Sequence, residues 1–206
     1  MHALALTATL SAAAFVAGAL WMQDSAPKRF THPISKDADG GMARWMETMK
    51  PGPAHQRLAE LIGTYDLTMR MQMAPGQPPM ESKGTLEISW LAEGKWRQTR
   101  GEISMLGQKS MLASSIGYDN FKQRYVWAKV DGLQTELATA MGHFDKSGDN
   151  LILWGTIDEP MTPEQDKMVK YVWRGYGQDT FVLEVHDMMI GEENTRVLEI
   201  EHRRRK

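Results

Sequence analysis

The chain has 206 residues, 42% of them hydrophobic and 24% charged, a size that a single all-β barrel or sandwich commonly uses. Lys and Arg total 24 against 26 Asp and Glu, and the formal net charge of −2 argues against nucleic-acid binding, which usually needs a clear basic excess. The absence of cysteine excludes disulfides, thiolate metal sites, iron–sulfur clusters, thiol nucleophiles and the lipid-bearing cysteine of a lipoprotein.

The N-terminal segment predicts export. Residues 1–23 contain no Lys, Arg, Asp or Glu and are rich in Ala, Leu and Val. The small residues Ala17, Gly18 and Ala19 resemble a signal-peptidase site, so we expect a signal peptide over 1–19 and a periplasmic or secreted bacterial protein. Because no Lys or Arg precedes the apolar run, the alternative is that this segment stays uncleaved as a membrane anchor. We expect the protein to contact a membrane only in that case and only through this segment.

A polar stretch and two short helical patterns follow. Residues 20–41 include two prolines and a Gly-Gly and have no apolar period, which predicts a disordered tether. Helical spacing is present over Met42 to Met49 and again over Pro53 to Ile62, where proline suits the first turn. Gly63 then predicts the end of the second helix.

From Thr64 onward the apolar period changes from helical to two. One face of the first such segment is apolar, with Tyr65, Leu67, Met69, Met71 and Met73. Turn residues separate further strand-sized runs up to the C-terminus, and we expect about ten strands. No long helical pattern lies between them, so consecutive antiparallel pairing is the simplest topology.

The pattern favours a closed barrel over an open sheet, because closure removes the two unpaired edges. We therefore predict an all-β fold in residues 42–206. The expected architecture is an up-and-down antiparallel barrel of about ten strands, lipocalin- or calycin-like, with one or two short N-terminal helices capping one mouth. A barrel wider than about eight strands is not filled by its own side chains, so its interior is suited to a small ligand.

Several segments give the chain a family likeness. They are HQRLAELIGTYDL at 55–67, PGQPPMESKGT at 75–85, GYDN at 117–120, GHFD at 142–145, DEPMT from Asp158 and RVLEIEHRR at 196–204. In these segments the chain resembles the bacterial family known as domain of unknown function 1579, whose members are uncharacterised and lipocalin-like. The resemblance implies a barrel and no settled activity. Tyr65 differs from the Trp that the family more often has at this point.

Candidate ligand contacts are the large apolar side chains of the strand faces and one histidine. They are Met69, Met71, Trp90, Trp127, Tyr171, Trp173 and His186. The alternative is that the tryptophans only fill the core. Methionines can also bind soft metals, but in an alternating strand they suit an adaptable apolar interior better, and we expect no metal site.

The histidines in predicted strands make haem an alternative, although we expect the protein to have no cofactor. His143, His186 and His202 lie in predicted strands, and a related class of ten-stranded barrels holds haem through histidine. Neighbouring strand residues point to opposite faces, so Asp187 is badly placed to orient His186. A surface or hydrogen-bonded strand histidine is the simpler interpretation.

No catalytic signature is present: the sequence has no G-x-S-x-G, H-E-x-x-H, Walker loop or G-x-G-x-x-G after a strand. The leading hypothesis is an exported barrel that binds a small, mostly apolar molecule. Three alternatives stay open: a haem-binding or enzymatic barrel, an outer-membrane barrel, and a filled barrel with a structural or interaction role. The basic end HRRRK, in place of an aromatic final strand, counts against the outer membrane.

Overall fold

The computed structural model describes residues 38–73, 77–105, 107–160, 162–188 and 195–206. The expected signal peptide over 1–19 and most of the expected tether lie outside these residues. In the described residues, no helix has the length and apolar character needed to cross a membrane. Three short helical segments come first: α2 (Ala38–Thr48), α3 (Pro53–Gln56) and the 3-10 helix η1 (Arg57–Leu61). Thus α2 begins before the expected Met42, and the second expected helix is divided between α3 and η1.

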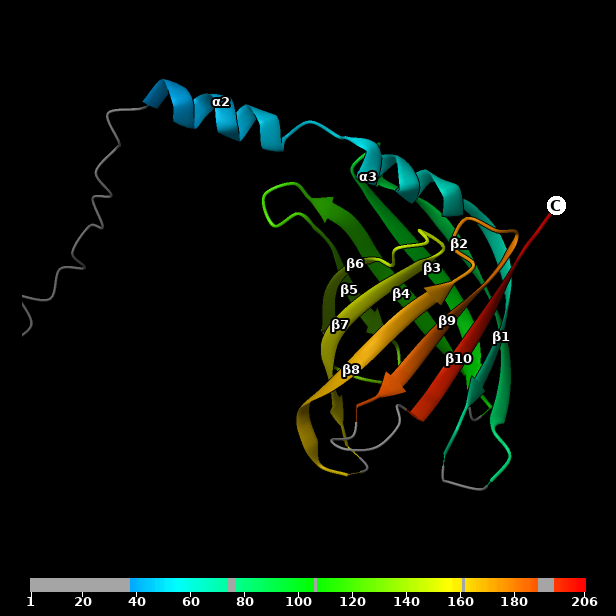
Figure 1. Ribbon diagram of the computed structural model, residues 1–206. Helices are drawn as coiled ribbons and strands as arrows, with labels where there is room; N and C mark the ends of the chain where they lie inside the picture. Colours follow the sequence, from blue (N-terminus) through cyan, green and yellow to red (C-terminus); the bar gives the residue numbers. More distant parts are fainter. Residues whose placement is uncertain (1–37, 74–76, 106, 161, 189–194) are drawn as a thin grey trace, which may run out of the picture. The chain divides into compact units, whose positions relative to one another are not determined.

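Ten strands then follow in the described chain. They are β1 (Gly63–Met71), β2 (Met80–Ala92), β3 (Trp96–Met105), β4 (Gln108–Asp119), β5 (Arg124–Asp131), β6 (Ala138–Phe144), β7 (Asn150–Glu159), β8 (Glu164–Arg174), β9 (Thr180–Asp187) and β10 (Thr195–Arg204). Each pairs with the next in antiparallel order, and β10 also pairs with β1, which closes the barrel (Figure 1). This confirms the predicted up-and-down architecture.

The register assigns one face of every strand to the interior. On β1, Tyr65, Leu67 and Met69 are buried, and their partners on β10 include His202 and Ile200. The alternation of apolar and polar residues in the sequence is therefore the alternation between the inside and the outside of the barrel.

Glycines allow the wall to bend sharply. A Cβ atom on Gly101 of β3 would overlap the carbonyl oxygen of Thr85 on β2, and one on Gly155 of β7 would overlap that of Thr139 on β6. At these two positions β3 approaches β2 closely, and β7 approaches β6 closely, because the glycines have no side chain. Such glycine kinks let a wide sheet curl into a barrel.

The segments α3 and η1 lie over one end of the barrel (Figure 1). Leu58 and Leu61 of η1 are fully buried in the same apolar cluster as the strand residues. Two tyrosine hydroxyls fix this cap, because Tyr65 donates to the Leu61 carbonyl at 3.0 Å and Tyr125 donates to the Ala54 carbonyl at 2.8 Å. The expected plug of one mouth is thus present.

Candidate functional site

Aromatic rings fill the inner face nearest the helical cap. Tyr65 meets Phe181 edge to face with ring centres 5.4 Å apart. Trp127 meets Tyr171 at 4.8 Å and Trp173 at 5.3 Å, in similar T-shaped arrangements. These contacts stabilise the rings beyond the apolar area that they bury.

Most of the residues predicted as ligand contacts do face the interior. Met69, Trp127, Tyr171 and Trp173 are buried there, and Met71 shares the inward face of β1 but is only half-buried. Trp90 of β2 is half-buried and packs against the buried cluster. Six of the seven candidates are therefore on the inner face.

His186 lies on the opposite face. It alternates on β9 with the inward-facing Val185 and Asp187, and its Nε2 atom lies 3.0 Å from a carboxylate oxygen of Glu184. Glu184 also accepts hydrogen bonds from Arg174 and Arg196. His186 is thus part of a charged network on the outer wall, and Asp187 points away from it as the sequence predicted.

Glu184 is the centre of this network. Burial of its carboxyl raises the pKa, but hydrogen bonds from His186, Arg174 and Arg196 outweigh that effect and lower the pKa below its ordinary value. Glu184 is 6% exposed, and its charged carboxylate has three hydrogen-bond partners. It holds β8, β9 and β10 together from outside.

Several inward-facing apolar residues are only partly buried. Leu112 of β4, Leu183 of β9, and Leu198 and Ile200 of β10 belong to this group by their register, and each retains solvent exposure. Leu183 and Ile200 are direct neighbours in the middle of their strands. Solvent contact at mid-strand positions on the inner face means that side chains do not fill this part of the barrel.

The inner wall formed by β2, β3 and β4 carries small residues. By register this group comprises Ser82, Gly84, Thr99, Gly101, Ser110 and Ser114. Ser82 and Ser110 are buried. These small residues are interspersed with larger ones, such as Leu86, Ile88 and Ile116, on the same inner wall.

The interior also contains polar atoms that sequence reasoning missed. Arg97 of β3 is 3% exposed, and within the described residues its Nε and Nη1 atoms have no hydrogen-bond partner. The hydroxyls of Tyr171 and Tyr176 are likewise buried without a described partner. The run WRQTR has polar residues on both faces, so it gave no signal of which side faces inward. In the structure Arg97 is paired with Trp90 and Ile116, which face inward, so Arg97 faces inward as well.

His202 is the histidine that the barrel buries. Its ring stacks on Phe181 with centres 4.2 Å apart, and its Nδ1 atom lies 2.9 Å from the Ile200 carbonyl oxygen, to which it donates in the neutral form. Burial lowers its pKa to about 3, and the nearby positive charge of Arg97 acts in the same direction. His202 is therefore neutral at physiological pH and adds no charge to the interior.

Of the three histidines considered for haem, only His202 faces the interior, where its ring stacks on Phe181 and its Nδ1 atom is hydrogen-bonded to the Ile200 carbonyl. His186 is on the outer wall, and His143 of β6 is exposed. In the described part of the chain, no cluster of three His, Asp or Glu residues is arranged to hold a metal ion.

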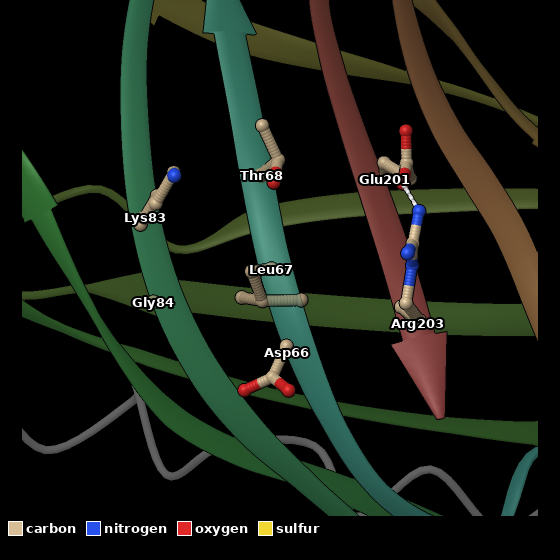
Figure 2. Close-up of a pocket in the computed structure, with 7 residues that line it drawn as sticks. All are labelled: Asp66, Leu67, Thr68, Lys83, Gly84, Glu201 and Arg203. Atoms are coloured by element: carbon tan, nitrogen blue, oxygen red, sulfur yellow. Dashed lines mark hydrogen bonds and ion pairs between the residues drawn. The ribbon is translucent and has the colours of Figure 1, made fainter. Parts of the chain in front are cut away.

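A separate groove lies on the outer wall over β1, β2 and β10 (Figure 2). It has a volume of about 380 Å³ and is lined by Asp66, Leu67, Thr68, Lys83, Gly84, Glu201 and Arg203. Three of its charged residues have ionic partners: Arg203 contacts Glu201 at 3.2 Å, and Asp66 pairs with Arg205. The groove is polar and open, in contrast to the aromatic interior.

Comparison with known proteins identifies the family. The family described as "Protein of unknown function (DUF1579)" matches residues 50–204, and the chain therefore belongs to it. No curated protein gives a significant match. Among solved structures, the crystal structure of Rv2717c from M. tuberculosis is similar, with a TM-score of 0.56 and 14% identity over 76% of this chain and 100% of that one. At this identity the likeness concerns the fold alone.

Proposed function

We propose that this protein is an exported carrier that binds a small, mostly apolar molecule inside its barrel. The observation that carries the proposal is the partial exposure of Leu183 and Ile200, which face inward at mid-strand. A filled barrel would bury both of them. A ten-stranded barrel is also wider than the size that side chains alone fill.

The lining supports an apolar ligand. Trp127, Tyr171 and Trp173 offer broad rings, and Met69 offers an adaptable thioether beside them. Pockets for small molecules usually combine such walls with a few polar groups, and the buried hydroxyl of Tyr171 is one of these. The proposed export depends on the apolar N-terminal segment of the sequence.

The outer wall argues against the outer-membrane alternative. A lipid-facing barrel needs a continuous apolar belt on its outer surface. Here the outward side chains form an ionic network across β8, β9, β10 and β1, in which Glu184 contacts Arg196, and Arg196 and Arg70 both contact Glu199. Charges at this density are costly in a hydrocarbon layer.

The test is to block the interior with one side chain. Ser114 faces inward on β4, and its neighbour Ser115 faces outward, so Ser114→Phe and Ser115→Phe form a matched pair. The probe is N-phenyl-1-naphthylamine, a neutral dye whose fluorescence rises in apolar surroundings. We expect the wild type and Ser115→Phe to bind it and Ser114→Phe to lose binding.

Equal binding by the two variants would place the dye outside the barrel and contradict the proposal. The same would follow if the wild type failed to bind the dye and organic extracts of the purified protein contained no small molecule. Circular dichroism of both variants controls for folding.

A further inference from the structure

Arg97 is a buried cation whose buried nitrogens have no partner. Its neighbours across the ladder are Trp90 on β2 and Ile116 on β4, which place it on the inner face. The guanidinium lies 5.5 Å from the ring centre of Tyr176, but its buried Nε and Nη1 atoms hydrogen-bond to no group in the described chain. An aromatic ring compensates a buried charge only in part, so this arrangement is costly for the protein alone.

Unlike Arg97, the other inward-facing cations each have a carboxylate partner. Lys129 of β5 contacts Asp131 at 3.6 Å, Lys167 of β8 contacts Asp187 at 2.7 Å, and Arg204 of β10 contacts Asp179 at 3.1 Å. No ion pair of Arg97 is present among the described residues. The interior therefore has one excess positive charge at this point of the inner wall.

Further donors lie on the same inner face of β3 and β4 as Arg97. Thr99 is two residues along β3 on the same face, and Ser114 pairs with it directly on β4. Both are half-buried. The buried hydroxyl of Tyr176, whose ring Arg97 contacts, also lacks a partner in the described residues. A guanidinium is suited to the planar, bidentate recognition of an oxyanion, and hydroxyls on the same wall can add further hydrogen bonds.

We infer that the ligand is an amphipathic organic anion whose acidic group binds Arg97, with the hydroxyls of Thr99 and Ser114 as further donors. This inference depends on the proposed function, because it specifies the chemistry of the interior ligand. The apolar body of the ligand would contact the aromatic wall, and its anionic end would neutralise the excess charge. The expected class includes compounds with one carboxylate or sulfonate on an apolar body.

Two dyes of nearly the same shape test the role of charge. One is 1-anilinonaphthalene-8-sulfonate, and the other is the neutral N-phenyl-1-naphthylamine; both are titrated into the delipidated full-length protein by fluorescence. We expect the wild type to bind the sulfonate about tenfold more tightly, since one charged hydrogen-bonding contact is worth roughly that factor. Arg97→Met should abolish this preference and leave the affinity for the neutral dye within about threefold.

Matched variants separate Arg97 from other charges. Arg100→Met removes the same charge from the exposed outer face of β3, and Lys129→Met removes the paired cation opposite Ser114. Both should retain the preference for the sulfonate. Arg97→Gln, which keeps a polar side chain, gives a second variant if Arg97→Met folds poorly, and Thr99→Val should weaken the sulfonate about threefold.

Three results would overturn the inference: equal affinity of the wild type for the two dyes, a preference that survives in both Arg97 variants, or a preference that is lost in Lys129→Met instead. If the neutral dye still binds inside the barrel, each of these results overturns this inference alone, and the carrier proposal stands. If neither dye binds and Ser114→Phe changes nothing, the carrier proposal itself fails. Circular dichroism and urea unfolding of each variant establish that it is folded.

Discussion

Burial of His202 should make the stability of the barrel depend on pH. Its pKa is lowered to about 3 in the folded protein, whereas a histidine in an unfolded chain has a pKa of about 6.5. Between these two values the unfolded state binds a proton that the folded state does not. Lowering the pH therefore favours unfolding, so the contribution of His202 is fully present above about pH 6.5 and is lost as the pH falls toward 3.

The size of the effect follows from the two pKa values. Each pH unit between them is worth about 1.4 kcal/mol, so the free energy of unfolding should fall by about 3 kcal/mol between pH 7.5 and 4.5 through this residue alone. Arg97 and Tyr65 are the charged and titratable side chains that lie near the ring. The carboxyl of Asp145, with a pKa of about 2, loses its contribution only at lower pH.

Urea unfolding at several pH values measures this prediction. His202→Gln replaces the ring by a group that does not titrate, and His143→Gln makes the same change at an exposed position of β6. The wild type and His143→Gln should lose about 3 kcal/mol more than His202→Gln over the range. The pKa of His55 is also lowered by burial, but His55 is common to all three proteins, so its effect cancels. If the free energy of unfolding falls equally with pH in the wild type and in His202→Gln, the reasoning is wrong.

Three further predictions concern stability and are measured by urea or thermal unfolding at neutral pH. Arg97→Met, in the ligand-free protein, should raise the free energy of unfolding by about 1 to 3 kcal/mol, because relief from burying an unpaired charge exceeds the lost contact with Tyr176; a less stable variant would contradict this. Glu184→Gln should destabilise by about 2 kcal/mol, since Arg174 and Arg196 lose their shared carboxylate, whereas Glu87→Gln at an exposed position of β2 should have no measurable effect. Gly101→Ala should cost about 2 kcal/mol or more through overlap with the Thr85 carbonyl and Leu86, and an unchanged midpoint would show that the wall can yield there.

The fold was predictable from the sequence because its pattern is local. The alternation of Tyr65, Leu67 and Met69 with polar residues defines the inner face of β1, and glycines, prolines and Asx residues separate the strands. The helix bounds were less accurate. Residues 57–61 form a 3-10 segment, which has no clear signature in the hydrophobic period.

The candidate site was only partly predictable for a physical reason. Large apolar residues such as Trp127 and Tyr171 indicate the interior by their chemistry. Arg97 does not, because an arginine is usually on the surface, and only the pairing of β3 with β2 and β4 assigns its face. His186 shows the reverse case, where an attractive residue near a strand end lies on the outer wall. Register across strands is non-local information that one strand does not contain.

The joining of β1 to β10 has a consequence for how the chain acquires its structure. This seam brings together segments from opposite ends of the barrel sequence; for example, Arg70 and Glu199 are 129 positions apart and form a 2.7 Å contact. Contacts of such long range make folding slow, and the seam cannot form until the ribosome has completed the final strand. A nascent or prematurely terminated chain would expose the edges of β1 and β9 as templates for aggregation.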